Sequence, residues 1–231
     1  MTTNSHPQLR FDADDLKLKH PFSMIVDGGR RTGKTQFVKR VILNMNRIIT
    51  PSIQHIIWFY ATAQEEVFRE IRENLGEHRV EFVKGLPSDG GIDDSYLQSR
   101  YGTKLVVIDD LMTEANKRQD VNNLFTRGRH ENTSVMLLVQ NFHNAGKFMR
   151  ENSLNADYIV RFKSPRNGSG VTYLASQMGK REFVNDAYEK ATGTTPFSYL
   201  FFDYRADTPE PLRLRNDILA TYPRFFVELY K

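Results

Sequence analysis

A glycine-rich segment near the start of the chain constrains its fold more than any other feature. Residues 28–35 read Gly-Gly-Arg-Arg-Thr-Gly-Lys-Thr and fit the pattern G-x-x-x-x-G-K-[ST]. The apolar residues 24–26 precede the segment, and apolar residues at helical spacing follow it. The segment therefore stands after a predicted buried strand and opens a predicted helix, as a phosphate-binding loop must. A glycine-rich turn before an ordinary helix is disfavoured, because strand, spacing and helix all agree.

This loop has the chemistry to bind a nucleoside triphosphate. Its glycines let backbone N–H groups approach a phosphate, and a helix N-terminus adds partial positive charge. Lys34 is expected to reach the β- and γ-phosphates, and the Thr35 hydroxyl to bind Mg²⁺. ATP and Mg²⁺ are thus the expected cofactors. The residues expected to bind the nucleotide are Gly28, Gly29, Arg30, Arg31, Thr32, Gly33, Lys34, Thr35 and Gln36.

Strands and helices alternate along most of the chain. Dense apolar runs predict strands at 53–60, 79–83, 104–111, 135–139 and 158–162. Helical spacing predicts helices at 35–46, 64–75, 117–130, 171–178 and 181–191. Such alternation predicts an α/β fold with a mainly parallel sheet and helices on both faces, closed by a hairpin of residues 197–204 and 211–215. The aromatic residues Phe197, Tyr199, Phe201 and Phe202 are interpreted as core and sheet surface rather than as a base-stacking platform.

Composition sets the remaining bounds on fold and partners. The 231 residues suit one large domain over 21–231, after an N-terminal arm or short edge element (1–20) too poor in apolar residues for a core element. The absence of cysteine excludes disulfides and cysteine-based metal or redox sites, and is compatible with an intracellular setting. The net charge of +4 favours a polyanionic partner only mildly. We expect no membrane segment and no signal peptide, because no apolar run approaches roughly 18 residues and the start is polar.

Two carboxylates end the apolar run 104–111. A hydrolytic phosphate-loop protein needs a carboxylate at the end of a buried strand to hold Mg²⁺, and Asp109 is placed for this role. Asp110 is then expected to orient and polarise the attacking water. Gln140 ends the next strand, and ligands gather at the carboxyl ends of parallel strands, so we expect it beside Asp110. Taken alone, Gln140 is only a polar residue at a strand end.

A basic segment, Thr-Arg-Gly-Arg-His at 126–130, lies between these two strands. An arginine presented to the next subunit would stabilise the charge of the transition state. Arg129 is the preferred candidate and Arg127 the second. The alternative is a solvated basic end of a helix, which the helix dipole favours. The six histidines show no metal-ligand spacing, and we find no nucleophilic triad.

Four stretches, taken together, resemble one family. They are 20–35 around the loop, 105–112 around the carboxylates, 125–140 with Gly-Arg-His and Ser-Val-Met-Leu-Leu-Val-Gln, and 155–166 (Asn-Ala-Asp-Tyr-Ile-Val-Arg-Phe-Lys-Ser-Pro-Arg). Over residues 20–215 the chain resembles the genome-packaging ATPases of double-stranded DNA viruses and virus-like transposons. These belong to the FtsK–HerA superfamily and include the poxvirus-type packaging ATPase and those of polintons and adintoviruses. The loop alone is typical of a much larger superfamily, so the resemblance to this particular family depends mainly on the last two stretches.

The resemblance implies a RecA-like fold with an additional strand, a homo-oligomeric ring (expected to be a hexamer) and ATP-driven movement of double-stranded DNA into a viral capsid or its portal vertex. The residues carried over by position are Lys34 and Thr35 for phosphate and Mg²⁺, Asp109 for the metal, Gln140 as sensor and Arg129 before the histidine. Asp110 departs from the family pattern, because relatives commonly carry glutamate at this position and aspartate is one methylene shorter. The implied location is inside an infected host cell, with association with the virion as a further expectation.

DNA contacts are expected from lysine and arginine on loops that face a central pore. The candidates are Lys163, Arg166, Lys180 and Arg181, each of which has the alternative of being a solvated basic residue.

Three functions remain open from the sequence. The first is an ATP-hydrolysing DNA translocase that packages a genome. The second is an ATP-gated assembly or binding module with little turnover, motivated by the shorter carboxylate of Asp110. The third is another DNA pump of the FtsK–HerA type, which shares the chemistry and against which the lack of a membrane segment argues modestly.

Overall fold

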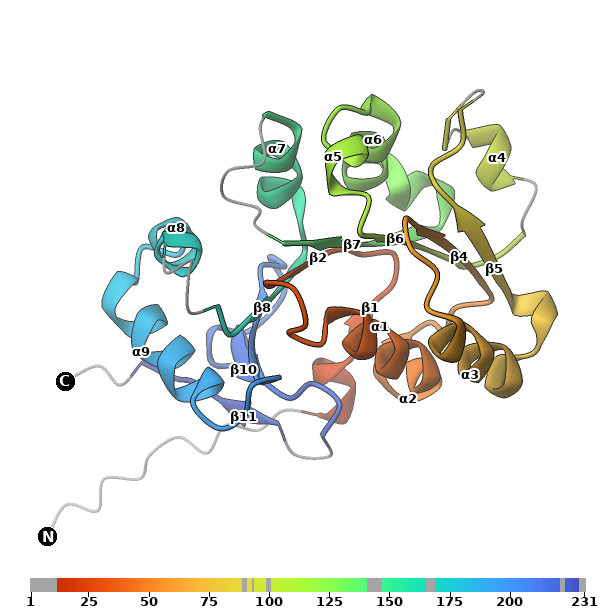
Figure 1. Cartoon of the computed structure of the whole chain (residues 1–231). Coiled ribbons are helices and arrows are strands. Elements are labelled where there is room, and N and C mark those ends of the chain that lie inside the picture. Colours follow the sequence, from red (N-terminus) through yellow and green to blue (C-terminus); the bar gives the residue numbers. More distant parts are fainter. Residues whose placement is uncertain are drawn as a thin grey trace, which may run out of the picture.

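Parallel strands form the centre of the structure (Figure 1), a computed structural model that describes residues 12–88, 91–92, 94–98, 101–140, 147–164, 169–220 and 223–228. Within these residues the main sheet has the strand order β11-β10-β9-β8-β2-β7-β6-β4-β5. The strands from β8 to β5 in this order run parallel, and β9, β10 and β11 are antiparallel additions at one edge. The bounds are β2 (Ser23–Asp27), β4 (His55–Tyr60), β5 (Val80–Lys84), β6 (Lys104–Asp109), β7 (Thr133–Val139), β8 (Tyr158–Phe162), β9 (Tyr199–Asp203), β10 (Leu214–Asn216) and β11 (Arg224–Phe225).

Helices cover both faces of the sheet, as predicted (Figure 1). One face carries α1 (Lys34–Leu43), α2 (Met45–Ile48) and α3 (Glu65–Leu75). The other carries α4 (Asp94–Gln98), α5 (Met112–Ala115), α6 (Gln119–Arg127), α7 (Lys147–Asn155), α8 (Ser169–Gln177) and α9 (Arg181–Thr192). Alternating side chains of β2 enter opposite cores, with Met24 and Val26 on the α1 face and Ile25 on the other. None of the helices in the described ranges combines the length and apolar character needed to cross a bilayer.

The order of the central strands positions the functional residues. β7 lies between β2, which leads into the phosphate loop, and β6, which ends in the carboxylates. The resemblance implies such an additional strand. All three strands run in the same direction, so their carboxyl ends lie side by side along one edge of the sheet, the carboxyl edge. This carboxyl edge brings together residues that are far apart in sequence.

Several elements differ from the prediction. The helix predicted at 117–130 consists of α6 followed by a 3₁₀ turn (Gly128–Glu131), and α4, α5, α7 and β11 have no counterpart in the prediction. The expected arm or edge element contains β1 (Leu18–Lys19), which pairs with β3 (Ile49–Thr50) in a second small sheet. Leu18 is only 1% exposed and joins the core. Leu18 thus anchors the edge element to the core, because pairing with β3 buries it.

His20 is a buried histidine that should make stability depend on pH. Its Nδ1 lies 2.7 Å from Ser134 Oγ, which itself accepts a hydrogen bond of 3.0 Å from the Phe22 N–H. The Ser134 hydroxyl hydrogen is therefore available to donate to Nδ1 of a neutral imidazole. Burial lowers the pKa of His20 to about 4 from an ordinary value of 6.5. The unfolded chain therefore binds a proton between these two values that the folded protein does not bind.

We expect His20→Asn to reduce the loss of stability on acidification. Because the folded pKa is depressed, the contribution of His20 is fully present above pH 6.5 and declines as pH falls toward 4; by pH 5 the loss is about 2 kcal/mol. Asparagine keeps a polar atom near the position of Nδ1 but does not titrate. Urea unfolding of both proteins at pH 7 and pH 5 measures the difference, and other titrating groups cancel. An identical loss in both proteins would contradict the assignment of His20.

Candidate nucleotide-binding and hydrolytic site

The loop between β2 and α1 is a tight backbone turn that only glycine permits at two positions. A Cβ on Gly28 would lie 2.6 Å from Thr32 Oγ1 and 2.8 Å from Phe162 Cβ, so the backbone passes closer than any side chain allows. Gly33 has a φ of 96°, in the left-handed region. The Thr32 hydroxyl donates to the Gly29 carbonyl at 2.9 Å and closes the turn. Arg30 and Arg31 lie exposed on the outside of this turn.

Lys34 lies inside the loop. Its ammonium donates to the Gly28 carbonyl at 2.8 Å and to the Gly29 carbonyl at 2.9 Å, so the side chain folds back across the turn. Burial lowers the pKa of Lys34, and the nearby Asp109, Asp27 and Asp110 act in the opposite direction. A phosphate here would replace the neutral carbonyl acceptors with anionic oxygens, so that both the donor and the acceptor would carry charge. The N-terminus of α1 begins at this residue and favours the same anion.

Thr35 and Asp109 form an oxygen pair next to the lysine. The Thr35 hydroxyl donates to Asp109 Oδ2 at 3.0 Å and accepts a hydrogen bond of 3.1 Å from the Gln64 side-chain amide. Gln64 lies between β4 and α3, and sequence reasoning missed it. Its signal is its position after a strand adjacent to β6, since the loops after neighbouring parallel strands meet at one edge.

These two oxygens fit Mg²⁺. Burial raises the pKa of Asp109 to about 6, although the Thr35 hydrogen bond and the Lys34 charge lower it again in part. A cation at this position would stabilise the charged carboxylate. Within the described parts of the chain, no group of three or more histidine, cysteine or acidic side chains could hold a metal by itself. Mg²⁺ suits such a sparse set, because it usually binds through one or two protein oxygens together with phosphate and water.

Asp110 and Gln140 meet at the same edge. The Gln140 amide donates to Asp110 Oδ1 at 2.9 Å, so the structure brings together the two residues expected there. Asp110 has a φ of 58°, which places it in the left-handed region immediately after β6. Aspartate and asparagine adopt this region more readily than longer side chains. The backbone thus gives a physical reason for the shorter acid at this position.

A buried ion pair lies directly before the phosphate loop, at the end of β2, and sequence reasoning missed it. Asp27, the last residue of β2, pairs with Arg161 of β8, and the two residues stand opposite each other in the sheet register. Both side chains are fully buried. Arg161 interrupts an otherwise apolar run, and a charge inside a buried strand is the signal that predicts such a partner.

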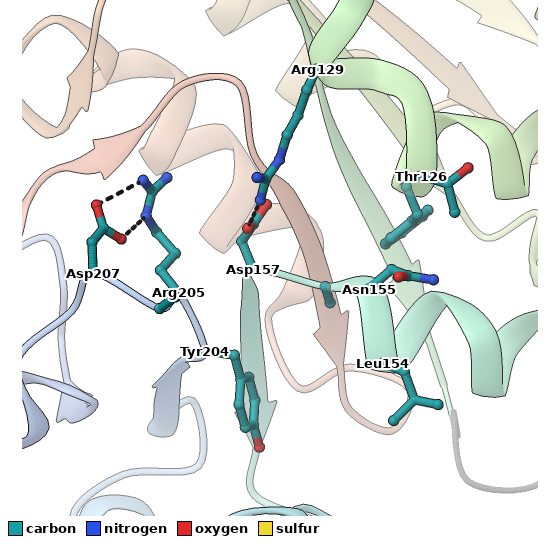
Figure 2. Close-up of a pocket in the computed structure, with 11 residues that line it drawn as sticks. Thr126, Arg129, Leu154, Asn155, Asp157, Tyr204, Arg205 and Asp207 are labelled. Atoms are coloured by element: carbon teal, nitrogen blue, oxygen red, sulfur yellow. Dashed lines mark hydrogen bonds and ion pairs between the residues drawn. The ribbon is translucent and has the colours of Figure 1, made fainter.

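Arg129 lies beside the amino end of β8, at the opposite ends of the strands from the phosphate loop. It forms an ion pair with the buried Asp157 (Figure 2), which also accepts hydrogen bonds from the Ser23 N–H at 2.8 Å and hydroxyl at 3.0 Å. Ser23 begins β2 and Asp27 ends it, so about 13 Å of strand separates this pair from the phosphate loop. Arg129 therefore cannot reach the loop of its own chain. Its side chain is 65% exposed and accessible to another molecule.

A cleft of about 550 Å³ surrounds Arg129, between α6, α7 and the loop after β9 (Figure 2). Arg205 lines the same cleft and is held by Asp207 through two contacts of 3.0 and 3.1 Å. Leu154, which is 63% exposed, lies at its rim. The sequence reasoning did not single out Arg205, because nothing near it in the sequence marks it as a neighbour of Arg129.

The candidate DNA-contacting residues occupy different environments. Lys163 and Arg181 are exposed, although Arg181 donates to the Ser176 hydroxyl at 3.0 Å. Lys180 lies 3.3 Å from both Glu210 and Glu228, and these carboxylates compete with any phosphate contact. Arg166 falls outside the described residues.

One of the late aromatic residues departs from the prediction. Tyr199, Phe201 and Phe202 are buried, as expected for core and sheet residues. Phe197 is 61% exposed and lies against Gly33 of the phosphate loop, where a Cβ would meet its ring at 3.3 Å. The interpretation of Phe197 as core or sheet surface is wrong, because the residue lies in a turn before β9 begins.

Known structures share this architecture. The genome packaging NTPase B204 from Sulfolobus turreted icosahedral virus 2, solved in complex with ATP-gammaS, superposes with a TM-score of 0.52 at 15% identity, over 91% of this chain and 98% of that one. The fold is that of a RecA-like P-loop NTPase. The cytoplasmic domain of the type VII secretion ATPase EccC from Thermomonospora curvata superposes with a TM-score of 0.51 at 12% identity, over 84% of this chain and 25% of that one. No protein-family model and no curated protein matches the sequence.

Proposed function

We propose that this protein hydrolyses ATP and couples hydrolysis to the movement of double-stranded DNA into the capsid of a virus or virus-like transposon. The observation that carries the proposal is the convergence of Lys34, Thr35, Asp109, Asp110 and Gln140 at one strand edge of a RecA-like sheet. Their contacts link the phosphate loop, the metal-side carboxylate and a second acid with its amide partner. This set contains the groups that phosphoryl transfer to water requires.

In the proposed mechanism Lys34 and the loop N–H groups bind the β- and γ-phosphates. Thr35 and Asp109 hold Mg²⁺, which when bound neutralises charge on these phosphates. Asp110 accepts a hydrogen bond from a water molecule and aligns it with the γ-phosphorus. The water oxygen bonds to phosphorus as the bond to the bridging oxygen breaks, giving ADP, inorganic phosphate and a proton. Gln140 orients the Asp110 carboxylate through its hydrogen bond.

In this proposal Arg129 supplies a positive charge that stabilises the transition state of ATP hydrolysis. Because it lies across the sheet from its own loop, it would act on the nucleotide of a neighbouring copy, with Arg127 as the second candidate. Such an arrangement requires a homo-oligomer, proposed to be a hexameric ring of the FtsK–HerA type. The sequence resemblance supports the ring, and the likeness to the viral genome packaging NTPase over nearly the full length of both chains supports the packaging role. The protein would then act inside the infected cell, with the capsid or its portal vertex as partner.

ATP hydrolysis with and without double-stranded DNA tests this function. We expect Mg²⁺-dependent release of phosphate, and a higher rate with DNA of any sequence, because the proposed contacts go to phosphates. The stimulation should fall as salt rises from 50 to 200 mM. Lys34→Ala serves as the control for contaminating ATPases and should show no hydrolysis.

The second candidate function is an ATP-gated assembly module with little turnover. It is favoured by Asp110, which is shorter than the glutamate that relatives commonly carry and would leave the attacking water less well aligned. Slow hydrolysis that DNA does not stimulate, together with nucleotide-dependent oligomerisation, would support this candidate. Brisk DNA-stimulated hydrolysis would exclude it. Another DNA pump of the FtsK–HerA type would behave like the packaging motor in this assay.

A further inference from the structure

We propose that Phe197 is the platform on which the base of the bound nucleotide stacks, and that the cavity beside it receives the nucleoside. This inference rests on the proposed nucleotide binding. Phe197 is 61% exposed, an unfavourable environment for a benzyl side chain, and its ring packs on Gly33 of the phosphate loop. An exposed aromatic ring beside bound phosphates is positioned to contact a base, because every base presents a π-face.

A rigid turn holds the ring in this position. Residues 195–198 read Thr-Pro-Phe-Ser, and the Ser198 N–H donates to the Thr195 carbonyl at 3.2 Å to close the turn. Pro196 fixes φ at the position where turns favour proline. The Ser198 hydroxyl lies 2.8 Å from the Thr195 hydroxyl and 2.9 Å from the Thr194 hydroxyl. The platform is therefore preorganised, so that little ordering entropy is lost when a base stacks on it.

A cavity of about 580 Å³ opens beside the ring. Phe197, Arg40 and Tyr199 line it, with Phe197 next to Gly33 of the phosphate loop, and Asn216 and Asp217 contribute polar groups. Arg40 lies four residues after Gln36, and both are exposed, so they share one face of α1 about 6 Å apart along the axis. The cavity thus begins within about one helical turn of the residues expected to bind phosphate.

The strand order assigns the cavity to the nucleoside end of the ligand. Asp109 and Asp110 follow β6, on the β7 side of β2, and these carboxylates would face the terminal phosphate and its metal. The cavity lies on the opposite side of β2, where β8, β9 and β10 follow in the sheet. A nucleotide whose terminal phosphate points toward the carboxylates must extend its base toward Phe197.

The test compares ATP with inorganic tripolyphosphate, which has the phosphates but no base. Dissociation constants of both are measured by calorimetry with Mg²⁺ for the wild type, Phe197→Ala and Phe197→Tyr. We expect Phe197→Ala to weaken ATP binding by about 5- to 100-fold, in line with the loss of one base–aromatic stack. Tripolyphosphate binding should be unchanged, and Phe197→Tyr should retain ATP affinity. Tyr101→Ala is the matched control, because Tyr101 is 87% exposed and lies before the amino end of β6, whereas the phosphate loop follows the carboxyl end of β2.

Each other outcome overturns the inference in a distinguishable way. ATP binding by Phe197→Ala with unchanged affinity would exclude the stacking platform and leave the ATPase function intact. Equal weakening of ATP and tripolyphosphate would show that Phe197 acts by shaping the phosphate loop through Gly33. A wild-type protein that binds neither ligand would overturn the proposed nucleotide binding itself, and the platform with it.

Discussion

Asp110→Asn is expected to lower the rate of ATP hydrolysis by at least about 100-fold while leaving ATP binding within a few-fold of the wild type. The amide is nearly identical in shape and can still accept the hydrogen bond of Gln140 through its oxygen. It also tolerates the φ of 58° at this position. It lacks the negative charge that polarises the attacking water. Release of phosphate in a single turnover and the dissociation constant of ATP measure the two quantities separately.

Two further variants define what this result means. Lys34→Ala should lose binding as well as hydrolysis, because its ammonium lies inside the phosphate loop. Asp110→Glu introduces a longer acid but places it in the left-handed region, where long side chains are disfavoured. If Asp110→Asn hydrolyses ATP at the wild-type rate, another group must align the water. Gln64, which lies next to Thr35, would then be the residue to test.

The sequence predicted the core of this site because its residues lie at fixed distances from strong local signals. The motif sets the positions of Gly28, Gly33 and Lys34, and Asp109 and Asp110 directly follow a dense apolar strand. Gln140 depends only on the rule that parallel strands end at one edge. The same rule, applied to β4, would have found Gln64. Local pattern therefore suffices wherever the residue is adjacent in sequence to the element that positions it.

Pattern fails where long-range packing decides the structure. α7 buries Met149 together with the polar Asn152 and Ser153, so it has no apolar periodicity to detect. Phe197 precedes an apolar strand and resembles part of it, yet a turn exposes its ring. The placement of Arg129 and Arg205 in one cleft depends on how α6 and the loop after β9 meet across the sheet (Figure 2). The spacing of residues along the sequence does not predict that Arg129 and Arg205 lie close together.

Arg129→Ala is expected to lower ATP hydrolysis by roughly 10³-fold or more, because a trans-acting arginine contributes about 10³ to 10⁵ in rate. The loss should appear in the hydrolysis step and leave ATP binding unchanged, since Arg129 and the phosphate loop of its own chain lie at opposite edges of the sheet. Arg127→Ala is the matched control, because Arg127 is exposed, basic and two residues away.

Mixing two inactive proteins tests whether Arg129 acts between subunits. Lys34→Ala provides an intact Arg129, and Arg129→Ala provides an intact phosphate loop. In a randomly mixed ring about a quarter of the interfaces combine both intact elements, so activity should reappear to roughly that fraction of the wild-type rate. An arginine acting on its own chain would give no activity in any mixture. Mixtures without activity would contradict the trans-acting role of Arg129, and so would full activity of Arg129→Ala alone. Arg127 would then be the remaining candidate for the trans-acting arginine.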